Sequence, residues 1–357
     1  MSRLIFYHPL PDWGGLARVY VELGKALAGR GATVAVVCPG GSSVAEGCRG
    51  LDVIPFDDRG AWLSDGNRLA GVLREFSADA VCVAHDDPHL TVAWAVRRSG
   101  RGAVLRRVPT GAEAEVSLGT RLAVRLAPTW FVHTSAAEAK ASEPVSRLRG
   151  RVIADLAIDP SPLERVIAAP TPIGTSTLVV VTDPYAQRAT AAALRTVATL
   201  RGRGHPVRAI LVGTPHDVNE VRVHATALGL GDALTILGDP IDRAPVLAAA
   251  DAVWITADRD DGGIAVLDAM ALGRTPIVTR GVMAERFVTH DQTGIVVDRD
   301  DALSTAAVIT LLQADASLLE QIGHAAQLSI RARRGLSASA DAFMAALNEA
   351  ATARVAA

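Results

Sequence analysis

One stretch in the second half of the chain joins acidic residues and glycines in an order suited to binding a phosphorylated ligand. From Ala252 to Val278 the sequence is AVWITADRDDGGIAVLDAMALGRTPIV. An apolar strand runs into an acidic loop, then into Gly262 and Gly263, and then into a helix expected over Ile264–Leu272. Glycine lets the backbone approach a ligand closely, and the free N–H groups at a helix start favour phosphate. The candidate amides are those of Gly263, Ile264 and Ala265.

Two carboxylates flank these glycines. Asp260 stands at the strand end and Asp268 inside the helix, so both can face one bound molecule, the first near a sugar and the second near a ribose. An Asp in such a loop is, taken alone, more often a solvated residue or a helix cap than a ligand contact, and a lone Gly-Gly at a strand–helix turn is usually only a turn. Asp258 and Asp260 have the spacing of an Asp-x-Asp metal motif, but their place in the second half of the chain argues against that role. We therefore expect no metal site.

The elements that must position these residues alternate along the whole chain. Continuous apolar runs, each followed by an amphipathic stretch, predict parallel sheets covered by helices on both faces. In the first half the expected strands are Arg3–Tyr7, Thr33–Cys38, Asp79–Ala84, Ala103–Arg107 and Thr129–His133, with a helix over Gly15–Gly29.

A second series of the same kind follows a proline-rich connection around Asp155–Thr177. Its expected strands are Leu178–Val181, Val207–Val212, Leu234–Leu237, Ala252–Thr256 and Thr275–Val278. The helices between them are expected over Ala189–Leu200, Val218–Leu228, Pro245–Ala250 and Ile264–Leu272, and a last helix over Ser337–Ala353. The sequence therefore predicts an α/β protein with two doubly wound, Rossmann-like domains, residues 1–160 with 337–357 and residues 171–336. A ligand cleft is expected at the carboxyl ends of their strands.

Composition narrows the class of protein. The 357 residues carry a formal net charge of −2 and three cysteines without metal-ligand spacing. These values argue against a nucleic-acid-binding protein, a disulfide framework and a zinc site. The N-terminal residues have no signal-peptide pattern, and no apolar run reaches the length of a membrane span. We expect a cytoplasmic protein. Basic residues outnumber acidic ones between Arg97 and Arg151, which leaves open a peripheral contact with an anionic membrane or acceptor.

The order of these segments resembles the family 4 retaining glycosyltransferases of the GT-B fold. Their signature has an acidic residue, seven others, a second acidic residue, Ala-Met-Ala-x-Gly and an apolar strand. In this sequence the first acidic residue is Asp260. The second acidic residue and the Ala-Met-Ala-x-Gly segment are Asp268 to Gly273, and the apolar strand contains Pro276 to Val278. Further matching segments are Glu285–Val297, Leu237-Gly238-Asp239, Ala249–Val253, and Gly14-Gly15 with Arg18 and Gly24–Gly31.

The resemblance implies a retaining transfer from a UDP- or GDP-sugar, without an obligatory metal or other cofactor. Asp260 would hold sugar hydroxyls and Asp268 the ribose. The diphosphate would lie against the backbone of Gly14–Gly15 and Gly262–Ala265, and against Arg188. Leu237 and Gly238 would border the base, and His85, at a strand end, would contact the acceptor. A GT-B fold also implies a final helix that crosses back to the first domain.

The largest departure from the family is at one charged position. Members usually carry an Arg and, five residues on, a Lys after the first strand of the second domain, whereas Asp183 and Arg188 stand there here. An Asp about 5 Å from a phosphate would repel it by about 3 kcal/mol at an effective dielectric of about 20. Either Asp183 turns away, or Arg188, Arg259 or Arg280 replaces the lost cation, or turnover is weak or lost.

Three functions therefore stay open. The first is a glycosyltransferase whose acceptor is a glycan, a lipid or a small molecule. The second is a catalytically inactive homologue that binds a nucleotide or a protein partner, for which Asp183 is the main argument. The third is a nucleotide-sugar epimerase of the same fold, which would need an acid–base set in the first domain that the sequence does not offer.

Overall fold

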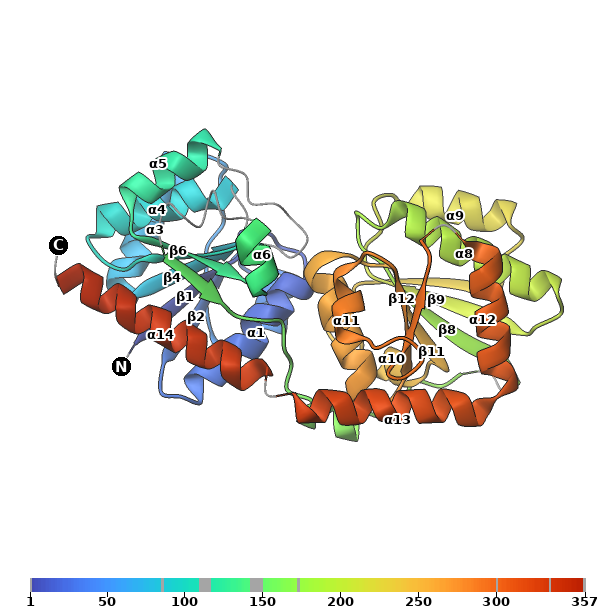
Figure 1. The fold of residues 1–357 in the computed structure, drawn as a ribbon. Coiled ribbons are helices and arrows are strands. Elements are labelled where there is room, and N and C mark those ends of the chain that lie inside the picture. The colour runs from blue at the N-terminus through green and yellow to red at the C-terminus, as the bar shows by residue number, and fades with distance from the viewer. Residues whose placement is uncertain are drawn as a thin grey trace. The chain divides into compact units, whose positions relative to one another are not determined.

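The chain folds into two compact units. The computed structural model describes residues 2–84, 87–108, 117–141, 150–171, 174–299, 301–333 and 335–355. Unit 1 comprises Met1–Ala157 and Gly335–Ala357, and unit 2 comprises Ile158–Arg334. Each unit has one parallel sheet with helices on both faces (Figure 1). The expected α/β class with two doubly wound sheets is confirmed.

Unit 1 contains a seven-stranded sheet of order β3-β2-β1-β4-β5-β6-β7, parallel throughout. Its strands are β1 Arg3–Tyr7, β2 Thr33–Cys38, β3 Asp52–Pro55, β4 Ala80–Ala84, β5 Val104–Arg107, β6 Thr129–His133 and β7 Gly150–Ile153. Its helices are α1 Gly15–Ala28, α2 Ser43–Gly47, α3 Trp62–Phe76, α4 Asp87–Ser99, α5 Leu118–Leu126, α6 Ala136–Ala141 and α14 Gly335–Val355.

The strand β1 shows how the sequence builds two cores in this unit. Successive side chains of a strand point to opposite faces. Leu4 and Phe6 therefore pack against α1 and α14, whereas Ile5 and Tyr7 pack into the core beneath α3 and α4. The ring of Phe343 in α14 lies 6.5 Å from that of Phe6. The last helix thus belongs to the first unit, as the fold class predicted.

Unit 2 contains a six-stranded parallel sheet of order β10-β9-β8-β11-β12-β13. Its strands are β8 Ser176–Val181, β9 Val207–Val212, β10 Leu234–Gly238, β11 Ala252–Ile255, β12 Thr275–Thr279 and β13 Ile295–Val297. Its helices are η1 Ser161–Arg165, α8 Gln187–Gly202, α9 Val218–Ala227, α10 Ala244–Ala248, α11 Arg259–Ala271, η2 Met283–Phe287, α12 Ala302–Ala314 and α13 Ala316–Ala332.

The strand order reverses beside β8, because β9 lies on one side of it and β11 on the other. Right-handed crossovers in opposite directions place α8 and α11 on opposite faces of the sheet. Ligands of open α/β sheets bind at the carboxyl ends of the strands next to such a reversal. In the part of the chain that the structure describes, no single helix has the length and apolar character of a membrane span.

Candidate functional site

The carboxyl ends of β8 and β11 are joined by backbone hydrogen bonds. The carbonyl oxygen of Val181, the last residue of β8, accepts from the N–H of Thr256 at 2.9 Å and from that of Ala257 at 2.8 Å. It also accepts from the hydroxyl of Thr256 at 2.8 Å. The loops that follow these two strands therefore start from one fixed point.

Asp183 extends this connection. Its side chain is buried, with 3% of the residue exposed. Oδ2 accepts from the N–H of Asp258 at 2.6 Å, and Oδ1 accepts from the N–H of Tyr185 at 2.8 Å. Of the three outcomes that the sequence left open at this position, the geometry favours the first. The carboxylate turns toward backbone amides of its own unit.

Asp258 carries the connection to a third loop. Its Oδ1 accepts from the N–H of Met283, which begins η2 after β12, at 3.3 Å. One chain of hydrogen bonds thus joins the loops after β8, β11 and β12 immediately before the first residue of α11. These are the loops in which the sequence placed the donor site.

The predicted start of α11 is wrong. We expected the helix from Ile264, but it begins at Arg259. The two glycines were the reason for the error, since glycine disfavours a helix interior by about 1 kcal/mol relative to alanine. The structure keeps Gly262 within the helix because a Cβ there would overlap the carbonyl oxygen of Ala257.

Because α11 begins five residues earlier than expected, the N–H groups without a partner inside the helix belong to earlier residues. The amides of Gly263, Ile264 and Ala265 lie beyond the first turn, where N–H groups bond to carbonyls four residues earlier. The N–H groups that have no such intrahelical partner belong to residues 258–261. The expectation that the three predicted amides are free at the helix start is therefore wrong. The place of these three residues in the donor site, with that of Gly262, stays a prediction.

Of the two predicted carboxylates of α11, the structure describes the side chain of Asp268 but not that of Asp260. Asp260 lies in the first turn of the helix, and its side chain is outside the described set. Asp268 is fully buried, and its Oδ2 accepts from Nε of Arg243 at 3.2 Å. The side chains of this ion pair are 1% and 7% exposed. Arg243 was not predicted from the sequence. The one feature that could have indicated it is its place as a single Arg immediately before the short helix α10.

Two of the three cations that could replace the missing Arg have side chains that the structure describes, and these two occupy different environments. Arg188 lies exposed in the first turn of α8, where its charge is near the carboxyl edge of the sheet. The side chain of Arg259 is outside the described set. Arg280 pairs with Asp298 at 2.7 Å and with Glu285 at 3.6 Å, and these carboxylates raise the pKa of its guanidinium. Arg188 is therefore the better-placed candidate of the two that the structure describes.

The predicted base segment lies at the end of β10. Leu237 is 45% exposed, which is unusual for a strand leucine, and Gly238 adopts a φ of +74° that favours glycine. The carbonyl of Gly238 accepts from the N–H of Gly213 at 2.6 Å. Both residues thus lie at the carboxyl edge of the same sheet as Asp183.

Two of the predicted residues of unit 1, Gly14 and Gly15, lie at the carboxyl side of its own sheet. Gly14 precedes α1 in an extended conformation, and its carbonyl accepts from the N–H of Arg18 at 3.0 Å. Gly15 is the buried first residue of that helix. His85 lies outside the described residues. The two glycines therefore stand at a helix N-terminus after β1, as the phosphate-binding expectation requires.

Two buried histidines of unit 1, His89 and His133, have lowered pKa values. Burial, together with the nearby Arg106, lowers the pKa of His89 to about 3. Burial, followed by Arg151 and Arg106, lowers the pKa of His133 to about 4. Both rings are therefore neutral at pH 7. Sequence reasoning missed them, because neither stands in a motif with chemical spacing.

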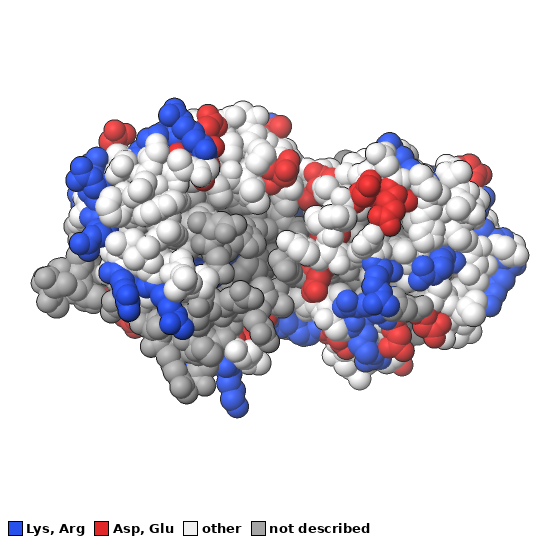
Figure 2. All heavy atoms as spheres, turned by 90° about the horizontal axis from the view of Figure 1, so that it is seen from above, with Lys and Arg blue, Asp and Glu red and all other residues white. Residues whose placement is uncertain are grey.

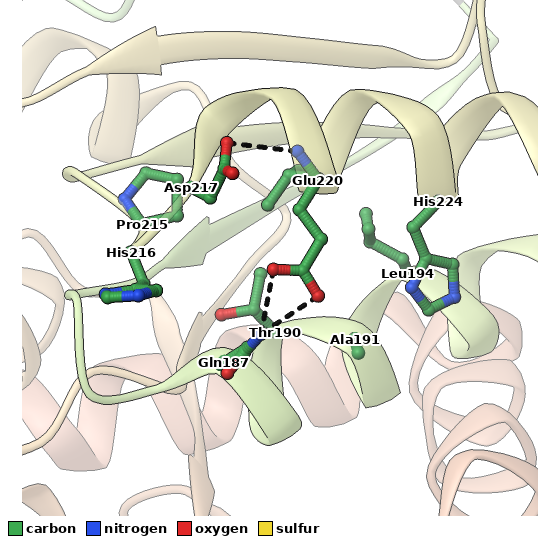
Figure 3. A pocket seen from close by; sticks show the side chains of 10 residues that line it. Gln187, Thr190, Ala191, Leu194, Pro215, His216, Asp217, Glu220 and His224 are labelled. Atoms are coloured by element: carbon green, nitrogen blue, oxygen red, sulfur yellow. Dashed lines mark hydrogen bonds between the residues drawn. The ribbon is translucent and has the colours of Figure 1, made fainter.

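A groove of about 350 Å³ lies between α8 and α9 (Figure 3). Across it, Nε2 of Gln187 donates to both carboxylate oxygens of Glu220, at 2.9 and 2.8 Å. His216 and His224 line the same groove. None of the residues predicted for the donor site lines it. Within the described ranges, no group of three or more His, Cys, Asp or Glu side chains is arranged to hold a metal ion.

Two family models match the chain. The model of glycosyl transferases group 1 matches residues 187–329, which include α8, α9, α10 and α11. The model of Glycosyltransferase Family 4 matches residues 13–110, which begin just before α1. The two matches contain the predicted site segments of both units.

One curated relative is the lipopolysaccharide core biosynthesis glycosyltransferase LpsE of Rhizobium meliloti (strain 1021), with 25% identity over 134 residues. The aligned part spans 38% of this chain and 39% of LpsE. The match therefore covers well under half of either protein.

Solved structures resemble nearly the whole chain. Anabaena Alr3699/HepE in complex with UDP-glucose has a TM-score of 0.77 and 15% identity, over 98% of this chain and 100% of that one. A glycosyltransferase from Rickettsia africae ESF-5 has a TM-score of 0.74 and 14% identity, over 98% of each chain. At such identities the likeness shows the fold, and it confirms the expected architecture of two Rossmann-like units.

Proposed function

Because the chain belongs to the family 4 glycosyltransferases of the GT-B fold, we propose that it transfers a sugar from a nucleotide diphosphate to an acceptor. UDP is the first donor to test and GDP the second, because HepE, a neighbour in fold, is described in complex with UDP-glucose. The transfer retains the anomeric configuration and has no obligatory metal.

The observation that carries this proposal is the convergence of three loops at the start of α11. The hydrogen bonds from Asp183 to Asp258, and from Asp258 to Met283, hold these loops at the carboxyl edge beside the strand-order reversal. That edge is the usual ligand site of such a sheet. The positive end of the α11 dipole at the same place favours a diphosphate.

Residue roles follow from this placement. Asp260 holds sugar hydroxyls near the reacting carbon, and Asp268 is the ribose-side carboxylate, oriented by Arg243. Arg188 and the backbone at the start of α11 stabilise the leaving diphosphate. The acceptor hydroxyl attacks the anomeric carbon on the face from which the diphosphate departs. The diphosphate leaves with the electron pair of the broken bond, and one of its phosphate oxygens takes the proton of the acceptor hydroxyl. Catalysis then rests on positioning and electrostatic stabilisation.

The acceptor that we propose is a glycan carried on a lipid. The support is the name of the curated relative, a lipopolysaccharide core glycosyltransferase, and a basic, partly apolar helix in unit 1. In α5, Leu118 is 86% and Leu122 is 42% exposed, beside the exposed Arg121 and Arg125. Figure 2 shows Lys and Arg side chains on the described surface of unit 1, and also on that of unit 2. A cytoplasmic enzyme in peripheral contact with an anionic membrane fits these features.

An inactive homologue is the second candidate, and the observation behind it is Asp183, which stands where the family carries a cation. Release of UDP or GDP from UDP-glucose, UDP-galactose and GDP-mannose, with a truncated lipopolysaccharide as acceptor, separates the two. The enzyme proposal expects acceptor-dependent release that persists in EDTA, and a product with the donor's anomeric configuration by NMR. Binding of UDP without sugar transfer would support the inactive homologue.

A further inference from the structure

Asp183 joins two loops that are far apart in the sequence. It follows β8, and its Oδ2 accepts from the backbone of Asp258, 75 positions later, at 2.6 Å. The carboxylate is buried, and its other oxygen accepts from the N–H of Tyr185. A buried carboxylate bound to two amides resists movement, because removing it leaves donors without acceptors away from water.

The amide that Asp183 binds has a particular place in the fold. Asp258 immediately precedes α11, so its N–H is one of the four at the helix start that have no partner within the helix. The carbonyl of Asp258 accepts from the N–H of Gly262 at 3.3 Å, and its carboxylate accepts from Met283 at 3.3 Å. Asp183 therefore sets the position of the residue from which the first turn of α11 is built.

We propose that Asp183 is a positioning residue for the donor, which holds the start of α11 in the place where Asp260 and the first-turn amides meet the sugar and the diphosphate. This inference rests on the proposed function. In the family, the cation at this position acts on the diphosphate. Here the position carries a negative charge, to which we assign a different role. The carboxylate acts on the backbone, and the diphosphate is left to the helix start and to Arg188.

The same two strands supply a matched control at their other ends. Oδ2 of Asp251, just before β11, accepts from the N–H of Thr177 in β8 at 2.7 Å and from the hydroxyl of Ser176 at 3.0 Å. Asp251 thus links β8 to β11 at the amino edge, as Asp183 links their loops at the carboxyl edge. Its loss removes a similar bond without touching the start of α11.

The experiment compares the wild-type protein with Asp183→Asn, Asp183→Ala, Asp183→Arg and Asp251→Asn. The measurements are the Kd of UDP by calorimetry, kcat and KM for the donor, and the thermal midpoint. We expect Asp183→Ala to lower kcat/KM by about 100-fold, the scale of a misplaced reacting group. Asp183→Asn, which keeps one acceptor oxygen, should lie between Asp183→Ala and the wild type. Asp251→Asn should lower the thermal midpoint alone.

Asp183→Arg gives the sharpest test. The proposal expects this variant to lose activity at least as far as Asp183→Ala, because an Arg cannot accept from the amide of Asp258. Higher turnover in Asp183→Arg would overturn the proposal, since the position would then be a vacant site for a catalytic cation. Tighter UDP binding by Asp183→Asn would also overturn it, because the carboxylate would then compete with phosphate for the helix start.

Failure of the positioning role is distinguishable from failure of the proposed function. If the wild type binds and turns over the donor, and Asp183→Asn behaves like Asp251→Asn, Asp183 has only a structural role and the inference is wrong. If the wild type neither binds nor uses any nucleotide sugar, the proposed function fails, and this inference fails with it.

Discussion

Arg243 and Asp268 form a buried ion pair between the segment before α10 and the interior of α11. Nε of Arg243 lies 3.2 Å from Oδ2 of Asp268, and both side chains are almost fully shielded from solvent. Removing one member of such a pair leaves an uncompensated buried charge, which costs about 3–5 kcal/mol. The carboxylate that the sequence assigned to the ribose is therefore also a stability element.

This pair gives the first prediction. Asp268→Ala should lower the free energy of unfolding by about 3 kcal/mol or more and abolish UDP binding. The double variant Arg243→Met with Asp268→Leu should recover much of the stability, because no buried charge remains, without recovering UDP binding. Denaturant unfolding and calorimetry measure the two effects. A UDP-induced thermal shift that survives Asp268→Ala would remove this carboxylate from the donor site.

The close approach at Gly262 gives the second prediction. Gly262→Ala should lower the stability of unit 2 and weaken donor binding, because the added Cβ overlaps the carbonyl of Ala257 and displaces the start of α11. Gly71→Ala in α3 is the control, since a Cβ there meets nothing within 4 Å. It should raise the stability by about 0.5–1 kcal/mol. Equal effects of the two variants in thermal unfolding would contradict the packing argument.

Acid stability gives the third prediction. The pKa of His89 is about 3 in the native protein against 6.5 for an ordinary histidine, so the unfolded chain binds a proton first as the pH falls below 6.5. Native stability therefore decreases on acidification, by about 1.4 kcal/mol per pH unit for each such group. His133, with a pKa of about 4, adds to the slope.

His89→Leu tests this linkage. Neither ring nitrogen of His89 has a hydrogen-bond partner among the residues that the structure describes. The variant should therefore match or exceed the wild type in stability at pH 7.5, and its unfolding free energy should fall less steeply between pH 6.5 and 4.5. Urea unfolding at a series of pH values measures both. An unchanged slope would show that His89 does not titrate as described.

Surface charge gives the fourth prediction. The double variant Arg121→Glu with Arg125→Glu should lose binding to vesicles that contain phosphatidylglycerol, and wild-type binding should weaken with salt. The control is Arg203→Glu with Arg222→Glu, which makes the same charge change on exposed residues of unit 2. Cosedimentation that is insensitive to salt, or equal loss in both variants, would contradict an electrostatic contact through α5.

The strands in the middle of each sheet were predictable, because they are continuous apolar runs. Arg3–Tyr7, Thr33–Cys38 and Val207–Val212 match the expected bounds. The short edge strands β3 and β7 were missed, since their side chains are mostly exposed or half-buried and no apolar run marks them. An apolar run marks a strand only where both of its faces are buried, and a strand at the edge of the sheet is covered less than a central one.

The location of the donor site stays a prediction, and the contacts of its residues could not be predicted from the sequence. Consecutive motif residues placed the donor loop before α11, but the partners of Asp183 and Asp268 lie 75 and 25 positions away. No local pattern connects such positions. The sign of the charge at Asp183 therefore suggested repulsion of a phosphate, whereas the structure shows a carboxylate bound to backbone amides.

The most direct test of the central claim is a crystal structure with UDP-glucose in the presence of EDTA. The account predicts electron density for the donor at the carboxyl edge of β8 and β11, with the diphosphate within hydrogen-bond distance of the backbone at the start of α11 and Asp260 on the glucose hydroxyls. A donor bound elsewhere, such as the groove between α8 and α9, or no donor at saturating concentration, would contradict it.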